Sequence, residues 1–324
     1  MSLWRTLKKI FPYFYSGERL LWRKTEPVSG LGKGELIPYP LSFAHIITGG
    51  YFPKFDTSGI PLGVSCGGHH YNPTAVCGYA FGLFELFCKY QRPKDRDDFL
   101  KQAGWLLSNQ RVEERSGKKV GVWIYDYEDT YSGASPPWIS GMAQGQAISV
   151  LLRAHALVND ERYLEAACLA FEPFQIDLRE GGVRSFDFGG LIFFEETPSD
   201  PPCHVLNGFI YSIIGIRELY DHTGDRTALA LFNQAITTLE RVLPLYDLGF
   251  WSSYDLPSRG FKNPASLWYH DVHIVLLDVL FEMTGKPIFA SYSWRWRQYR
   301  NGVGNRLLGL GAKVLYKGWR RLSG

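Results

Sequence analysis

The chain has 324 residues, of which 45% are hydrophobic and 15% aromatic, and its formal net charge is +3. This length can bury one large core, and the five cysteines, odd in number and mostly in apolar or helical contexts, exclude a disulfide framework. No stretch reaches the roughly 20 apolar residues of a transmembrane helix, and the N-terminus lacks the apolar run of a signal peptide. We therefore expect one enzyme-sized domain in a reducing compartment, the cytoplasm.

The charge is distributed unevenly along the chain. Residues 1–24 hold six Lys or Arg and one Glu, residues 295–324 hold eight Lys or Arg and no acid, and the middle is acidic. Trp and Leu lie among these basic residues, so two interpretations stay open. In one, the ends bind an acidic polymer or the inner face of an anionic membrane; in the other, they pack against the acidic body. No recognised nucleic-acid motif accompanies the charge, so we expect no nucleic-acid partner.

In chain order, the sequence predicts three parts. Residues 1–65 are an N-terminal segment with a basic start and short strands, residues 66–300 a helical catalytic domain, and residues 301–324 a basic amphipathic tail.

The central part repeats a two-helix plan. Apolar residues recur at spacings of three and four in paired runs, and the pairs begin at intervals of roughly 63 to 66 residues. This pattern predicts a mainly α fold, an (α/α) toroid of about four helical hairpins. The predicted helix pairs are 73–91 with a helix from 95, 140–158 with a helix from 160, 206–220 with a helix from 225, and 265–284 with 287–299.

Short runs of aromatic and β-branched residues connect the hairpins. They lie at 121–125, 182–186 with 190–194, and 249–254, each with a glycine at its start, which is typical of strands or β-hairpins. Each run follows the second helix of one pair and precedes the first helix of the next. In an alternating toroid such connectors emerge at one rim, which would gather the site-like side chains there: Tyr71, Trp123, Glu195, Glu196, Tyr254 and Tyr269.

The polar residues of these segments favour proton transfer. The sequence shows no Ser or Cys nucleophile context and no glycine-rich phosphate loop. The run Cys66 to His70 lacks a partner cluster, and His270 with His273 is more typical of hydrogen bonding within a site or core, so we expect no metal and no organic cofactor.

Four segments together resemble the D-glucuronyl C5-epimerase family. They are WISGMAQGQAISVLLRA at 138–154, FEETPSDPPCHVLNGFIYSII at 194–214, TLERVLPLYDLGFWSSYDL at 238–256 and WYHDVHI at 268–274. The resemblance covers roughly residues 70 to 300. It implies an isomerase that converts D-glucuronate to L-iduronate within heparan-type polysaccharides such as heparosan, so a glucuronate-containing acidic glycan is the expected partner.

The resemblance also implies catalytic positions. Removal of the C5 hydrogen, alpha to a carboxylate, needs a base on one face, neutralisation of the growing charge, and a proton donor on the other face. The family's catalytic positions map onto Glu196, Tyr254 and Tyr269. A tyrosine phenol can both donate and accept a proton, so the two tyrosines are the expected acid and base, and Glu196 deprotonates or orients one of them.

Two positions depart from the family pattern. Thr197 stands where the family usually has a site tyrosine, and Pro257 stands where it has an arginine that binds the uronate carboxylate. The candidate replacements for that arginine are Arg259, then Arg184 or His270.

Further residues are candidates for substrate binding, each beside a structural alternative. Gln144 and Gln146 either satisfy connector backbone or reach sugar hydroxyls. Asn207 is more typical of a helix-start residue. Trp138 and Tyr71 suit either a sugar platform or a staple at a helix start. The predicted substrate-binding set is Tyr71, Trp123, Trp138, Gln144, Gln146, Arg184, Glu195, Asn207, Arg259 and His270.

Three other functions remain alternatives. A lyase would remove the same proton and then lose the C4 substituent. A glycoside hydrolase on the same toroid would pair Glu195 or Glu196 with a second carboxylate, from Asp126, Glu128 or Asp187. Thr197 and Pro257 also allow an inactive glycan-binding protein. A monomer and a homodimer fit the sequence equally well.

Overall fold

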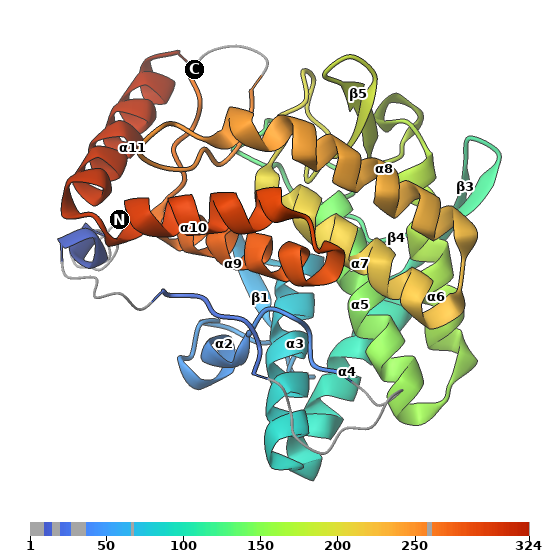
Figure 1. The fold of residues 1–324 in the computed structure, drawn as a ribbon. Helices are drawn as coiled ribbons and strands as arrows, with labels where there is room; N and C mark the ends of the chain where they lie inside the picture. Colours follow the sequence, from blue (N-terminus) through green and yellow to red (C-terminus); the bar gives the residue numbers. More distant parts are fainter. Residues whose placement is uncertain (1–9, 15–19, 27–36, 66–67, 258–260, 324) are drawn as a thin grey trace. The chain divides into compact units, whose positions relative to one another are not determined.

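The computed structural model describes residues 10–14, 20–26, 37–65, 68–257 and 261–323 (Figure 1). The chain divides into two compact units. The larger unit comprises residues 25–204 and 208–238, and the smaller unit comprises residues 1–24, 205–207 and 239–324. Three sequence-based predictions, the basic start at 1–9, Cys66 and Arg259, fall outside the described residues.

In its described residues, the larger unit holds three helical hairpins and three two-stranded antiparallel sheets. The sheets pair β1 (Leu62–Ser65) with β2 (Gly68–Tyr71), β3 (Arg111–Arg115) with β4 (Lys118–Val122), and β5 (Arg184–Asp187) with β6 (Leu191–Phe194). The helices are α2 (Ala44–Thr48), α3 (Pro73–Tyr90), α4 (Pro93–Asn109), α5 (Gly141–Val158), α6 (Glu161–Phe171) and most of α7 (Leu206–Thr223) and α8 (Arg226–Val242), with short 3-10 turns η1 (Glu172–Gln175) and η2 (Leu178–Glu180).

Local chemistry fixes the helix ends close to where the sequence predicts them. Asn72 accepts a hydrogen bond from the Ala75 amide at the start of α3, and Ser140 does the same for α5. Gln91 and Asn159 then end these helices in the left-handed conformation. Such caps satisfy backbone groups that the helix itself leaves unpaired, so the predicted hairpin boundaries are confirmed.

Glycines bring α5 and α7 into direct backbone contact. A β-carbon at Gly215 would collide with the Gly145 carbonyl, and one at Gly145 would lie 2.6 Å from the Ser212 Cα. Helix α5 is therefore buried on nearly all sides. This close approach sets the distance between α5 and α7. The first turns of these two helices carry segments of the candidate site.

The connectors are β-hairpins in part. The sheets β3–β4 and β5–β6 confirm the predicted strands near 121 and 182–194, although the partner strand β3 was not expected. Within the described stretch 249–254 the prediction of a strand is wrong, and only isolated bridges occur there. The reason is that Ser253 N donates to Tyr246 O while Tyr254 N donates to Asn263 O, so successive residues bond to different neighbours and build no ladder.

The smaller unit is built on the fourth hairpin. It contains η3 (Leu243–Tyr246), α9 (Leu267–Thr284), α10 (Pro287–Asn301) and α11 (Val303–Ser323), and α9 and α10 lie side by side (Figure 1). A buried Arg300–Asp271 ion pair joins α10 to α9, with an Nε to Oδ1 distance of 2.6 Å. Asp271 also accepts from the Leu21 amide, which ties residues near the N-terminus to this hairpin.

The predicted tail, 301–324, is largely the helix α11, and it packs against its own unit. Buried Arg306 donates from Nε to the Tyr13 carbonyl at 2.9 Å, and Gly309 lies against the Trp251 ring, where a β-carbon would come within 2.9 Å. This face therefore matches the interpretation in which the basic ends pack on the body. No helix in the described part of the chain is long and apolar enough to cross a membrane.

Candidate active site

Tyr254 and Tyr269 meet in the smaller unit, although 15 positions separate them in the sequence. Their ring centroids are 4.8 Å apart at an interplanar angle of 59°. Tyr269 lies in the first turn of α9, where Ser266 caps the helix, and its side chain is 37% exposed. Tyr254 is half-buried; its amide donates to the Asn263 carbonyl and its carbonyl accepts from the Leu206 amide. The structure thus forms a partly open pair of phenols from two predicted catalytic residues.

A buried imidazole network lies in the same unit. The His270 ring stacks on Trp251 with centroids 3.7 Å apart. His270 Nε2 donates to the Trp296 carbonyl at 3.0 Å, which leaves Nδ1 to accept from the Ser252 hydroxyl at 2.8 Å. Because that hydroxyl has one hydrogen, His273 Nδ1 donates to the Ser252 oxygen at 3.0 Å. Both rings are therefore fixed by packing and hydrogen bonds.

Burial keeps these histidines neutral. It lowers the pKa of His270 well below its ordinary value and the pKa of His273 to about 3. The His270 ring is fully buried with both nitrogens hydrogen-bonded, an arrangement that fits a structural role, so contact with a substrate carboxylate stays a prediction for this residue. Among the described residues, no group of three or more His, Cys, Asp or Glu is placed to hold a metal ion.

Sequence reasoning missed a lysine beside the tyrosine segment. Lys313 of α11 donates from Nζ to the Asn263 side-chain oxygen at 2.6 Å, and the Asn263 carbonyl holds the Tyr254 amide. Burial, together with the charge of Lys317, lowers the pKa of Lys313 to about 8, while buried Asp255 acts in the opposite direction. The signal in the sequence was the helical spacing of Lys313 from Arg306 and Gly309, which places all three on the packed face of α11.

Arg184, a predicted carboxylate ligand, begins β5 in the larger unit. Its Nη2 donates to the Gln175 carbonyl at 2.7 Å, and its guanidinium lies 4.9 Å from the Phe186 ring centroid. Burial lowers the pKa of Arg184. These contacts orient the Arg184 side chain along the β5–β6 hairpin, and one of its guanidinium nitrogens is hydrogen-bonded.

The larger unit contains a buried cluster of charged groups around Glu195. His204 Nδ1 lies 2.7 Å from Glu195 Oε1, and His204 Nε2 lies 3.2 Å from Asp187 Oδ2. The Ser185 hydroxyl donates to Glu195 at 2.6 Å, and the His204 amide donates to its other oxygen. Burial opposes a charge on the ring, but the two carboxylates outweigh it and raise the pKa of His204. His204 was not predicted as a site residue; its position in the 194–214 segment was the available signal.

Glu196 lies directly against the backbone of α7. A β-carbon on Gly208 would come within 2.6 Å of Glu196 Oε2 and 2.7 Å of its Cβ, so only glycine leaves room for this side chain. The neighbouring Thr197, which departs from the family pattern, is buried. The third predicted catalytic residue is thus held half-buried at the first turn of a helix.

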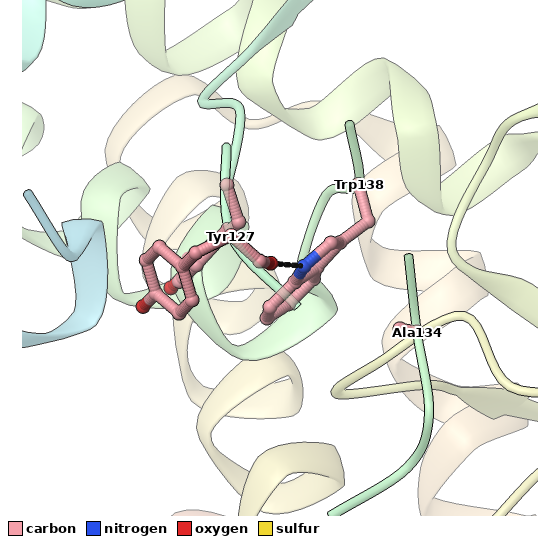
Figure 2. Close-up of a cluster of buried hydrophobic side chains, with 5 residues drawn as sticks. Tyr127, Ala134 and Trp138 are labelled. Carbon is pink, nitrogen blue, oxygen red and sulfur yellow. Dashed lines mark hydrogen bonds between the residues drawn. The ribbon is translucent and has the colours of Figure 1, made fainter. Parts of the chain in front are cut away.

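Trp138 belongs to a buried aromatic cluster that precedes α5, as Figure 2 shows. Its indole nitrogen donates to the Tyr127 carbonyl at 2.8 Å, and its ring stacks on Tyr125 with centroids 4.0 Å apart. Ala134 and Ala143 complete the cluster. This packing matches the staple at a helix start, one of the two roles that the sequence left open for Trp138.

Gln144 ties a connector to two helices. Its Nε2 donates to the carbonyls of Gly121 and Ala170, at 2.9 and 3.0 Å, and its oxygen accepts from the Trp123 amide. The Trp123 indole donates to the Leu106 carbonyl at 2.9 Å. Both side chains are buried. Gln144 therefore satisfies connector backbone, the first of the two roles considered for it.

The remaining candidates differ in exposure. Gln146 and Asn207 are buried. Tyr71 is 44% exposed, stacks on Trp105 with centroids 5.4 Å apart, and donates its hydroxyl to Asp56 at 2.9 Å. Of the predicted substrate-binding set, Tyr71 combines an exposed ring with a fixed orientation, which suits contact with a sugar face.

Comparison with known proteins identifies relatives of this chain. The family model described as "D-glucuronyl C5-epimerase C-terminus" matches residues 116–298. A D-glucuronyl C5-epimerase of Caenorhabditis elegans is 36% identical over 227 residues, which are 65% of this chain but only 36% of that protein. An uncharacterised protein of Methanocaldococcus jannaschii is 27% identical over 307 residues, 89% of this chain and 94% of that protein.

The fold also has a solved counterpart. The structure of cellobiose 2-epimerase from Bacillus thermoamylovorans matches 79% of this chain and 67% of its own, with a TM-score of 0.50 at 14% sequence identity. At this identity the likeness concerns the fold alone. Because that enzyme is an α/α toroid, the predicted fold class is confirmed.

Proposed function

Because this chain belongs to the D-glucuronyl C5-epimerase family, we propose that it inverts C5 of D-glucuronate to give L-iduronate in a polysaccharide or glycan precursor. The observation that carries the proposal is the contact between the Tyr254 and Tyr269 rings, since it joins two phenols that can exchange protons with a substrate. The chain spans little more than a third of the C. elegans relative, so the activity and substrate are proposed here on the residues of this chain.

The proposed chemistry needs two proton-transfer groups. One tyrosine, as phenolate, removes the C5 proton, and the other donates a proton to the opposite face of the planar intermediate. The side chain of Tyr269 is 37% exposed, and its place in the first turn of α9 puts it near the positive end of the helix dipole. That field favours both a phenolate and the developing charge of the enediolate.

A cation must neutralise the substrate carboxylate. We assign this role to Lys313, since its hydrogen bond to Asn263 holds the ammonium beside the segment that carries Tyr254. It would supply the charge that Pro257 cannot. With a pKa of about 8 the lysine is mostly protonated at neutral pH and can donate to a carboxylate.

Glu196 is the third proposed catalytic residue. Its carboxylate lies against Gly208 in the first turn of α7. In this assignment Glu196 takes part in proton transfer, whereas Glu195 holds the β5–β6 hairpin and the following loop in place through His204.

The test is incubation of glucuronate polymers, beginning with heparosan and its N-sulfated form, with the protein in D2O. Proton NMR should show iduronate signals and deuterium at C5, and Tyr254→Phe and Tyr269→Phe should lose both. Tyr90→Phe, at an exposed position that ends α3, is the matched control. Ultraviolet absorbance from a conjugated enol acid would identify a lyase instead, and binding without exchange on any uronan would identify a glycan-binding protein.

A further inference from the structure

Helix α11 has two faces with different surroundings. Its inner face is packed, because Arg306, Gly309 and Lys313 contact Tyr13, Trp251 and Asn263 of the same unit. Its outer face is open and apolar. The exposed side chains there, with their exposed fractions, are Val303 (56%), Leu307 (42%), Leu308 (57%), Val314 (58%), Leu315 (75%) and Leu322 (90%).

The exposed leucines form a continuous stripe. Leu308, Leu315 and Leu322 are spaced by seven residues, which places them on one line along an α-helix. Soluble monomers rarely leave such a stripe in water, so it marks an interaction surface. The helix remains anchored by its inner face, so this stripe can contact a partner without being lifted from the unit.

The charge on this helix is of one sign. Residues 303–323 contain five Lys or Arg and no Asp or Glu. By helical spacing, the exposed Arg321 and Lys317 lie at and beyond the edge of the outer face formed by Val303 and Val314, and half-buried Trp319 lies at the opposite edge, beside Leu308. Long basic side chains and an indole at the edge of an apolar face are suited to the headgroup layer of a bilayer.

Two more exposed aromatic side chains adjoin the start of α11. Phe11 and Phe14 are 60% and 53% exposed, and the Tyr13 carbonyl between them accepts the hydrogen bond from Arg306. The described N-terminal residues therefore add apolar surface beside the first turn of the helix. We propose that the outer face of α11, with Phe11 and Phe14, binds the surface of an anionic lipid bilayer.

Two other occupants fit the surface less well. A second copy of the chain would bring two helices of the same positive charge together, which costs free energy that no acidic residue on this helix offsets. An acidic glycan would satisfy the lysines and arginines but would leave the leucines in water. Only an anionic bilayer removes the apolar side chains from water and neutralises the cations at once.

The experiment is co-sedimentation of the full chain with vesicles. We expect binding to vesicles that contain phosphatidylglycerol, weaker binding to pure phosphatidylcholine, and loss of binding as salt is raised. Leu308→Gln and Leu315→Gln should each weaken binding about tenfold or more, since each removes a leucine side chain that the bilayer would bury. Lys317→Gln with Arg321→Gln should weaken it chiefly for anionic vesicles.

The control is Leu245→Gln, which changes a partly exposed leucine, 42%, of the same unit outside α11. It should bind vesicles as the wild type does, and thermal unfolding of each variant checks that the fold is intact. Three results would overturn the proposal: equal binding to neutral and anionic vesicles, equal binding by the leucine variants, or no vesicle binding together with a Leu315-dependent dimer in sedimentation velocity. None of these results depends on the proposed epimerase activity.

Discussion

A buried cluster in the larger unit and a tyrosine pair in the smaller unit hold their polar groups in different ways. In the larger unit, Glu195 and His204 are both nearly excluded from solvent and form a charged cluster with Asp187 and Ser185. In the smaller unit, Tyr254 and Tyr269 touch through their rings and remain partly exposed. This difference in exposure and bonding distinguishes polar side chains that stabilise the fold from polar side chains that are proposed to meet a ligand. A cluster whose members bind each other contributes to the stability of the fold, whereas the partly exposed pair is where we propose that a ligand binds.

The largest expected effect concerns the open pair. Tyr254→Phe or Tyr269→Phe removes one hydroxyl and keeps the ring contact, so we expect kcat/KM to fall by about 10²- to 10⁴-fold with little change in Tm. Steady-state kinetics on a glucuronate polymer and calorimetry check both parts. A fall in Tm that accounts for the lost activity would instead make the pair structural.

The closed cluster should behave in the opposite way. Glu195→Ala leaves His204 buried beside the lost carboxylate, and breaking such a pair costs about 3 kcal/mol of unfolding free energy. Urea unfolding measures this cost. Glu114→Ala, on the exposed strand β3, is the control and should stay within about 0.5 kcal/mol of the wild type. Equal stability of the two variants would contradict the structural role of Glu195.

Lys313 tests whether the smaller unit supplies the cation. Lys313→Gln should raise KM for a glucuronate polymer about tenfold, because a charge-assisted hydrogen bond is lost. In the wild type the ammonium is present below its pKa of about 8, so kcat/KM should decline as pH rises through that value. The variant should lack this alkaline decline. Lys317→Gln, one turn further along α11, should keep the decline but move it to higher pH, because the charge of Lys317 lowers the pKa of Lys313.

The smallest effect is the pH dependence of the cluster. Because the folded pKa of His204 is raised, the protonated ring adds stability that is fully present below the unfolded pKa of about 6.5. That contribution is lost as pH rises through the folded value. The stability difference between the wild type and His204→Gln should therefore shrink from acid to alkaline pH, and chemical unfolding across that range measures it. A constant difference would mean that the ring is neutral throughout.

Local signals in the sequence were sufficient for the helices. The capping residues Asn72, Ser140 and Ser266 each precede an apolar run, and the chain folds at those boundaries because the cap and the run act over a few residues. The family resemblance supplied the two tyrosines; the structure shows that their rings are in contact, and their catalytic role stays a prediction.

Features that depend on tertiary neighbours were not predictable in the same way. The run 249–254 has strand-like residues, but its amides bond to neighbours on different sides and form no ladder. His204 meets Glu195 only when the loop between them folds back, and Lys313 meets Asn263 only when α11 packs on its own unit. The sequence marked α11 as amphipathic but not which of its faces packs.

We propose that Tyr254 and Tyr269 act as separate acid and base. We would follow deuterium during the first turnovers of a glucuronate polymer in D2O, with product and remaining substrate analysed separately by NMR. Two groups on opposite faces predict deuterium at C5 of the iduronate formed while the remaining glucuronate is still unlabelled. Early return of the original hydrogen to the iduronate would mean that a single group performs both transfers, and the account of the pair would be wrong.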